Sequence, residues 1–119
     1  MIQIIRTNTD NLIACRIDGK INTEDIERIA NYIEDKFVKN KKLRIYVEVI
    51  KLEGISLEAL FKDLKLGIKH FSDFDKKAVV TDKKWMKKVA AIADKLFPNI
   101  EVKCFSIQEK EKALEWAKT

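Results

Sequence analysis

The stretch that decides the fold runs from Leu43 to Thr81 and reads LRIYVEVI, KLEG, ISLEALFKDLKLGIKHF, SDFD and KKAVVT. Its first and last runs are short and rich in β-branched residues, which predicts strands over Leu43–Ile50 and Lys77–Thr81. The run between them carries apolar residues at helical spacing and predicts a helix that Ser56 caps and that ends at about Phe71. Strand, helix and strand in this order predict a parallel pair of strands.

The flanking segments extend this unit in both directions. Two short strands precede it, and their link is so short that we expect them to pair antiparallel. The expected strands are Ile2–Ile5, Leu12–Asp18, Leu43–Ile50, Lys77–Thr81 and Ile100–Phe105, with Asp18-Gly19-Lys20 breaking the second. The expected helices begin at caps Asn22 or Thr23, Ser56, Thr81 or Asp82, and Ser106, and the last helix ends at Lys118. The order β-β-α-β-α-β-α-β-α predicts an α/β fold with a mixed four- or five-stranded sheet flanked by helices, in one domain over residues 1–119.

Composition narrows the classes of function. The chain has 119 residues, of which 46% are hydrophobic and 36% charged, which is typical of a globular protein. Its net charge is +5, but the lysines are scattered among 19 acids, so we expect no nucleic-acid binding. It lacks a membrane-length apolar run and a signal-peptide pattern, which predicts a cytoplasmic protein without stable membrane insertion. Cys15 and Cys104 stand alone in strand-like runs, so we expect buried thiols, no disulfide, no metal site and no cofactor.

Several short segments, in this order and at this spacing, resemble the SpoIIAA-like family of the STAS superfamily over nearly the whole chain. They are GKINTED (Gly19–Asp25), YVEV (Tyr46–Val49), EGISLEAL (Glu53–Leu60), FKDLKLGIKHF (Phe61–Phe71), AVVTDKKW (Ala78–Trp85) and ALEW (Ala113–Trp116). The resemblance implies a small cytosolic STAS/Sec14-like domain, which has regulatory partners or a lipid-like ligand. Anti-sigma-factor antagonists of this fold carry a phosphorylatable serine before the second helix. Ser56 has that place, but the Asp-Ser-Ser-Gly type turn is absent and Glu53 would repel a phosphate.

The second helix carries more apolar surface than one sheet needs. Beside its core stripe lies a flank of small, apolar and hydrogen-bonding residues, which suits a surface covered by a second subunit, a partner or a ligand: Ser56, Ala59, Asp63, Leu66, Gly67 and His70. The alternative is a helix that a neighbouring helix of the same chain buries more deeply. Asp63 and His70 are two turns apart, about 10 Å along the axis, which is too far for an acid–base pair within the helix.

Three further positions are candidates for binding. Gly54 and Ser56 precede a helix N-terminus and could form an anion seat, or they are a turn glycine and an ordinary cap. Glu48 is a carboxylate in a β-rich run. If it is buried, it needs a partner such as Arg44 on the same strand face or a lysine from a helix, and it could be a tuned acid in a pocket; the alternative is a partly exposed strand residue. Trp85 borders a lysine face on the third helix that could touch an anionic membrane or acidic partner, although a core role for Trp85 and a solvated lysine face are the alternative.

These patterns favour a non-enzymatic interaction or regulatory domain that acts through the second-helix flank, as a homodimer or with a protein partner. The alternative is a Sec14-like carrier or sensor of a lipid-like apolar ligand. Its pocket would lie between Tyr46, Glu48 and Ile50 on the central strand and the second helix. An enzyme is the third interpretation, but a lone histidine and the lack of a readable nucleophile–base pair speak against it.

Overall fold

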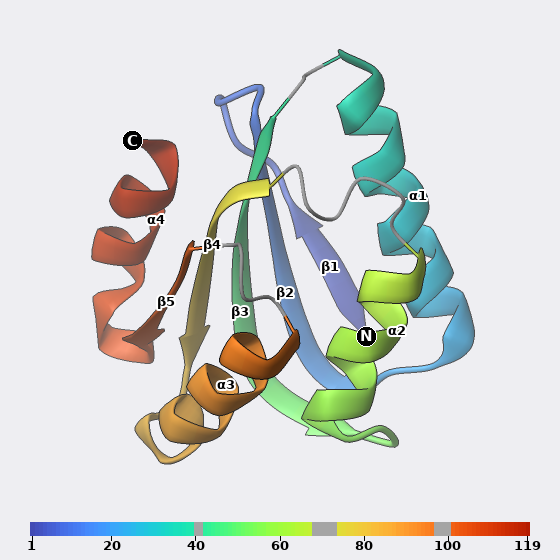
Figure 1. Cartoon of the computed structure of the whole chain (residues 1–119), viewed down its shortest axis with the longest axis vertical. Helices are drawn as coiled ribbons and strands as arrows, with labels where there is room; N and C mark the ends of the chain where they lie inside the picture. The colour runs from blue at the N-terminus through green and yellow to red at the C-terminus, as the bar shows by residue number, and fades with distance from the viewer. Residues whose placement is uncertain (40–41, 68–73, 97–100) are drawn as a thin grey trace.

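The structure is a computed structural model, and it describes residues 1–39, 42–67, 74–96 and 101–119 (Figure 1). Within these ranges, five strands and four α-helices follow one another, and a 3₁₀ turn, Ile107–Glu109, precedes the last helix. The strands are β1 (Ile2–Ile5), β2 (Leu12–Lys20), β3 (Leu43–Glu53), β4 (Phe74–Thr81) and β5 (Glu101–Ser106). The helices are α1 (Thr23–Lys39), α2 (Leu57–Gly67), α3 (Lys83–Leu96) and α4 (Lys110–Lys118).

The strands form one mixed sheet in the order β1-β2-β3-β4-β5. β1 pairs antiparallel with β2, and every later pair is parallel. Each parallel connection steps one strand in the same direction, so right-handed crossovers must place α1, α2 and α3 on one face. The predicted α/β class, element order and mixed sheet are therefore confirmed, with five strands.

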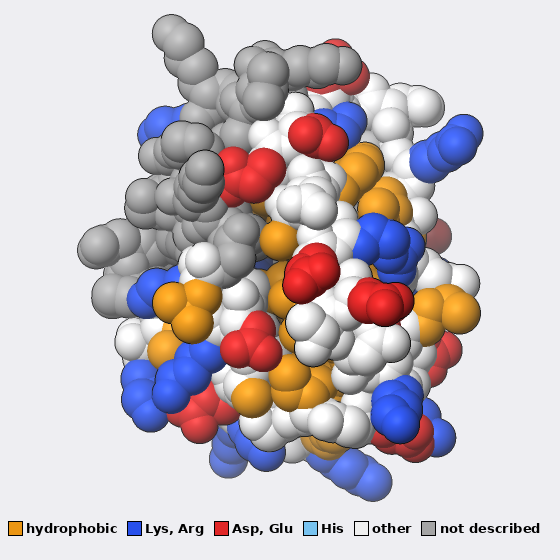
Figure 2. All heavy atoms as spheres, turned by 90° about the vertical axis from the view of Figure 1, so that its right-hand side faces the viewer, with side chains coloured by type: hydrophobic (Ala, Val, Ile, Leu, Met, Phe, Trp, Pro, Cys, Tyr) orange, Lys and Arg blue, Asp and Glu red, His pale blue; other side chains and the backbone are white. Residues whose placement is uncertain are grey.

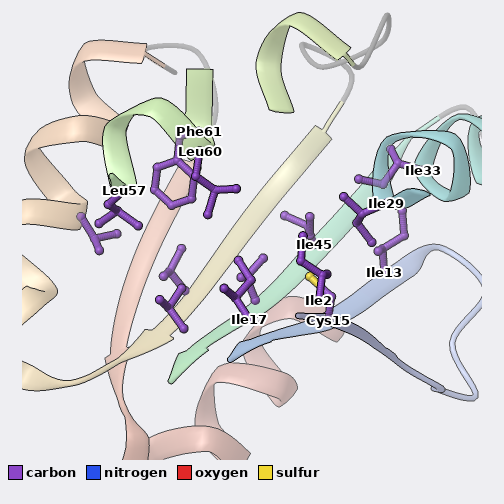
Figure 3. Close-up of a cluster of buried hydrophobic side chains, with 14 of the residues drawn as sticks. Ile2, Ile13, Cys15, Ile17, Ile29, Ile33, Ile45, Leu57, Leu60 and Phe61 are labelled. Atoms are coloured by element: carbon purple, nitrogen blue, oxygen red, sulfur yellow. The ribbon is translucent and has the colours of Figure 1, made fainter. Parts of the chain in front are cut away.

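The two faces of the sheet carry separate apolar cores, because side chains alternate along each strand. One core lies under α1, α2 and α3 and includes Ile13, Ile45, Val47 and Phe61; Figure 3 shows part of it. The other lies under α4, which occupies the opposite side of the sheet from α1 and α2 (Figure 1). It includes Leu12, Tyr46, Val80, Phe105 and Ala113.

Polar side chains cap the starts of α1, α3 and the segment before α4, at positions that the sequence predicts. Asn22 and Asp25 bond each other's backbone N–H reciprocally, so Asn22 is the cap of α1. Asp82 Oδ1 accepts from Lys84 N at the start of α3. Before α4, Ser106 N and Oγ both donate to Glu109 Oε1.

The predicted ends of three strands are wrong by more than one residue, and pairing between strands explains all three. β3 ends at Glu53 rather than Ile50, because its last three residues pair with the end of β2. Asp18, Gly19 and Lys20 do not break β2, because they pair with Lys51, Leu52 and Glu53 of β3 after a register shift at Ile17/Asp18. β4 begins at Phe74 rather than Lys77, since Phe74 pairs with Leu43. The predicted end of the second helix at about Phe71 lies outside the described residues.

Candidate functional site

The predicted flank of α2 borders a groove between α1 and α2. We call this the α1–α2 groove; its volume is about 590 Å³, and its lining is Thr23, Ile26, Glu27, Ala30, Asn31, Asp63 and Leu66. Leu66 is 86% exposed, which is unusual for a large apolar side chain so close to a helix pair. Figure 2 faces the side of α1 and α2 and shows apolar side chains lying between acidic ones.

The rest of α2 separates into a buried and an exposed part. Leu57, Leu60 and Phe61 are buried in the core against the sheet, as the predicted core stripe requires. Asp63 is exposed and shares the groove with Leu66, so the structure brings these two predicted residues together. Gly67 is the last residue of the helix, and His70 lies outside the described residues.

Gly54 and Ser56 lie before α2 and act on its backbone. Ser56 Oγ accepts a hydrogen bond from Ala59 N over 3.1 Å, which is an ordinary N-cap contact. Gly54 has φ +83°, a conformation that favours glycine, and a Cβ there would lie 3.3 Å from Lys20 Cγ. These contacts agree with the turn-and-cap interpretation and do not place either residue in the α1–α2 groove.

Glu48 lies at the centre of a polar cluster on the α4 face. It is only 3% exposed, so the expectation of a partly exposed strand residue is wrong. Its carboxylate accepts from Arg16 Nε over 2.6 Å and from the Tyr46 hydroxyl over 2.8 Å. Lys110 Nζ of α4 lies 3.6 Å away, so the expected helix lysine is present.

Arg44 is not the partner of Glu48, although the two share a strand face. Its Nη1 donates to Ala117 O over 3.4 Å, near the end of α4. Arg16 takes the place next to Glu48 because the parallel register puts it directly opposite on β2. Sequence reasoning missed Arg16, since strand register cannot be read from the sequence of one strand.

The cluster keeps Glu48 ionised despite its burial. Burial by itself raises the pKa of the Glu48 carboxyl, but hydrogen bonds from Arg16 and Tyr46, together with the charges of Arg16 and Lys110, outweigh it and lower the pKa below its ordinary value. Burial and the bond to Glu48 raise the pKa of Tyr46, so its hydroxyl stays protonated as a donor. The cluster is therefore a fixed charge pair rather than a proton-transfer site.

A second groove opens beside this cluster, and we call it the sheet–α4 groove. Its volume is about 420 Å³, and its lining is Ile5, Arg6, Thr7, Asn8, Ala14, Arg16, Tyr46, Glu48, Lys110, Glu111, Leu114 and Lys118. The predicted pocket between Tyr46, Glu48, Ile50 and the second helix is therefore wrong. Side chains alternate along β3, so Tyr46 and Glu48 face α4, whereas α2 packs on the opposite face of the sheet.

The positions of Trp85 and of the lysines on α3 agree with the alternative interpretation, in which Trp85 is a core residue and the lysine face is solvated. Trp85 is half-buried and packs against the core beneath the three helices. Lys84, Lys87 and Lys88 are exposed. Lys95 Nζ donates to Glu58 Oε1 of α2 over 2.9 Å, which ties α3 to α2.

The core beneath α1 and α2 contains a charged residue that sequence reasoning missed. Lys77 is 4% exposed, and its Nζ lies 5.0 Å from the centre of the Phe61 ring. Burial lowers the pKa of Lys77 to about 7, and burial raises the pKa of the nearby Cys15 thiol to about 12. The sequence does carry a signal for this burial, because Lys77 lies two residues before Val79 and side chains two residues apart on a strand point to the same face.

Cys15 and Cys104 are both free thiols, Cys15 buried and Cys104 half-buried. Among the residues that the structure describes, no three His, Cys, Asp or Glu side chains are grouped to hold a metal ion. In the same ranges, no helix has the length and apolarity needed to cross a bilayer.

A five-stranded mixed sheet with three helices on one face and one on the other defines a small α/β domain whose two grooves lie on opposite faces. The sequence model of the SpoIIAA-like family matches residues 12–118, and the chain belongs to that family. The fold of this family indicates a small regulatory or interaction domain. No protein of curated function matches the chain.

Among solved structures, the chain is similar to an uncharacterized protein with a SpoIIAA-like fold from Shewanella loihica PV-4. The sequences are 29% identical, and the match covers 98% of this chain and 92% of that chain with a TM-score of 0.72. This agreement supports the order of elements and the sheet described above.

Proposed function

We propose that this protein is a non-enzymatic interaction domain that regulates a protein partner through the α1–α2 groove. The observation that carries the proposal is the 86% exposure of Leu66 at the edge of that groove. A leucine this exposed contributes little to the stability of its own fold, but it can supply an apolar anchor when a partner covers it.

The lining of the groove indicates the chemistry of the partner. Ile26 and Ala30 of α1 give it an apolar floor, while Glu27 and Asp63 are its charged side chains among the residues that the structure describes. A partner segment that places an apolar side chain between Ile26 and Leu66, with a lysine or arginine beside it, would satisfy both features. Such a partner is either a second copy of this chain or a different protein.

The experiment compares wild-type protein with Leu66→Lys, which adds charge at the groove without removing a buried contact. We expect Leu66→Lys to fold normally and to lose the contact, seen either as a dimer becoming a monomer in light scattering or as one specific partner lost from cells in quantitative co-purification. Gly67→Arg at the end of α2 tests the same surface. Lys84→Gln, on the exposed face of α3, is the control and should leave assembly and partners unchanged.

Identical assembly states and identical partners for wild type and Leu66→Lys would contradict the proposal. Loss of a partner in both Leu66→Lys and Lys84→Gln would point to a non-specific electrostatic effect instead. The comparison therefore separates a specific contact at the groove from general surface charge.

A carrier of a lipid-like apolar ligand is the second candidate, and one observation favours it. An almost wholly apolar cavity lies between the sheet and α1 and α2, lined by residues that include Ile17, Ile33, Phe61 and Leu64. Its volume is about 20 Å³, so a lipid would enter only if α1 and α2 moved apart. Mass spectrometry of freshly purified protein before and after denaturation tests this; a released fatty acid or lipid would support it, and bare chain mass would count against it.

A further inference from the structure

We propose that the sheet–α4 groove binds a small organic anion, a carboxylate or phosphate on an apolar body, and that Arg16 is its principal contact. This site lies on the opposite face of the sheet from the α1–α2 groove, so it does not depend on the function proposed above. Three observations carry it: the orientation of Arg16, the charge of the lining and the shape of the groove.

The Arg16 side chain is held in place by a hydrogen bond to a buried carboxylate. Its Nε donates to the buried Glu48 carboxylate over 2.6 Å, and Glu48 is fixed in turn by the Tyr46 hydroxyl over 2.8 Å. A guanidinium anchored through Nε cannot rotate freely, so its remaining N–H groups keep one direction. Ordering this side chain beforehand reduces the entropy that a ligand must overcome on binding.

The free side of Arg16 is available to a ligand. The side chain is 40% exposed, and within the described part of the chain its Nη1 and Nη2 atoms make no hydrogen bond. Two parallel N–H groups of a guanidinium match the two oxygens of a carboxylate or phosphate. The geometry therefore offers a bidentate contact that Glu48 orients but does not occupy.

The charge of the groove favours an anion. Its lining includes four cationic side chains, Arg6, Arg16, Lys110 and Lys118, against the two acids Glu48 and Glu111. The Glu48 charge is buried and faces Arg16 and Lys110, so the excess positive charge lies toward solvent. A concave site of one sign concentrates small ions of the other sign.

The size and floor of the groove favour a small organic molecule over a bare ion. A volume of about 420 Å³ falls within the range of small-molecule sites. Ile5 and Leu114, both half-buried, supply apolar surface beside the cations. The groove remains open because α4 packs mainly on β3, β4 and β5 and covers this face of the β1–β2 hairpin only in part.

The test is a titration followed by nuclear magnetic resonance on the full chain, with phenyl phosphate and benzoate as organic anions and inorganic phosphate and acetate as bare ones. We expect saturable shifts at the Arg16 Nε–H signal and at the amides around Ala14 and Lys110, with tighter binding of the aromatic anions. The phosphate and carboxylate arms identify which anionic group is preferred.

The variants decide whether the site is specific. Removing the bidentate contact with Arg16→Gln should weaken binding by about tenfold or more. Lys110→Gln provides a second variant if Arg16→Gln does not fold, and it should also weaken binding. Lys95→Gln removes an exposed, ion-paired lysine on α3 and should leave the affinity unchanged.

Two results would overturn the proposal. One is the absence of saturable shifts in the groove with any of the four anions. The other is binding that Arg16→Gln, Lys110→Gln and Lys95→Gln weaken equally, because that would show only the general attraction of a basic protein for anions.

Discussion

Arg16 and Glu48 lie directly opposite each other on two neighbouring parallel strands, and Arg16 Nε donates to Glu48 Oε2 over 2.6 Å. Neither residue could hold this position alone, because a buried carboxylate needs a charged partner and a strand arginine needs an acceptor to fix its direction. Tyr46, two residues before Glu48, adds a second donor from the same strand face. One register of β2 against β3 thus builds the polar centre of the sheet–α4 groove.

The Tyr46–Glu48 hydrogen bond should be measurable as a coupling energy. Tyr46→Phe removes only the hydroxyl and should lower the free energy of unfolding by about 1.5–3 kcal/mol, because its acceptor is charged and buried. In a Glu48→Gln background, the same change should cost about 1 kcal/mol. Urea unfolding of the four proteins gives both values.

The control for that cycle is Tyr32→Phe on α1, whose hydroxyl makes no hydrogen bond in the described ranges. It should change stability by less than about 0.5 kcal/mol. Equal costs of Tyr46→Phe in the two backgrounds would show that Glu48 does not depend on this donor.

The buried Lys77 predicts that stability rises with pH above neutrality. Its pKa is lowered to about 7 by burial, whereas in the unfolded chain the ammonium keeps its proton to about 10.5. Between these values the unfolded state binds more protons, so the free energy of unfolding should increase from pH 7 to pH 9, by up to about 1.4 kcal/mol per pH unit. Urea unfolding across this range measures the slope.

The increase in the free energy of unfolding should end near pH 9, because the Cys15 thiol has the opposite effect on the pH dependence of stability. Its pKa is raised by burial from 9.0 to about 12, so the unfolded chain loses this proton first and the thiol's contribution to stability declines as pH rises further. Lys77→Met should flatten the slope between pH 7 and pH 9, while Lys62→Met on the exposed side of α2 should keep it. An unchanged slope in Lys77→Met would mean that Lys77 is charged in the folded protein.

Gly54 should be hard to replace for backbone reasons alone. Its φ of +83° is disfavoured for other residues, and a Cβ would lie 3.3 Å from Lys20 Cγ. Gly54→Ala should therefore destabilise the fold by about 1–2 kcal/mol. Gly19→Ala is the matched control, since its φ is +94° but nothing lies within 4 Å of the added Cβ, and thermal or urea unfolding should show the smaller loss. A Gly54→Ala protein with the same stability as wild type would contradict the claim that the backbone at Gly54 is strained for other residues.

Local patterns in the sequence were enough to predict most of the fold. Alternation in LRIYVEVI and helical spacing in the following segment predict a strand and a helix, and caps at Asn22, Asp82 and Ser106 mark helix starts. Leu66 stood out because it lies off the core stripe of α2, and it is indeed exposed. Each of these signals depends on residues close together in the chain.

The features that were missed depend on contacts between distant segments. The partner of Glu48 follows from the register of β2 against β3, and the extended ends of β2 and β4 follow from pairing with β3. The pocket was assigned to the wrong helix because a sequence of strands and helices does not state which face the last helix covers. All three parallel crossovers run in the same direction across the sheet, and this decides which helices share a face. The direction can be known only from the strand order.

The most direct test of the central claim is the effect of Leu66→Lys on association, measured by light scattering and quantitative co-purification beside wild type and Lys84→Gln. Because Leu66 is 86% exposed, the variant should match the wild-type free energy of unfolding to within about 0.5 kcal/mol. It should also lose a dimer or a specific partner that wild type and Lys84→Gln retain. A folded Leu66→Lys protein with the assembly and partners of wild type would contradict the claim that the α1–α2 groove is the interaction surface.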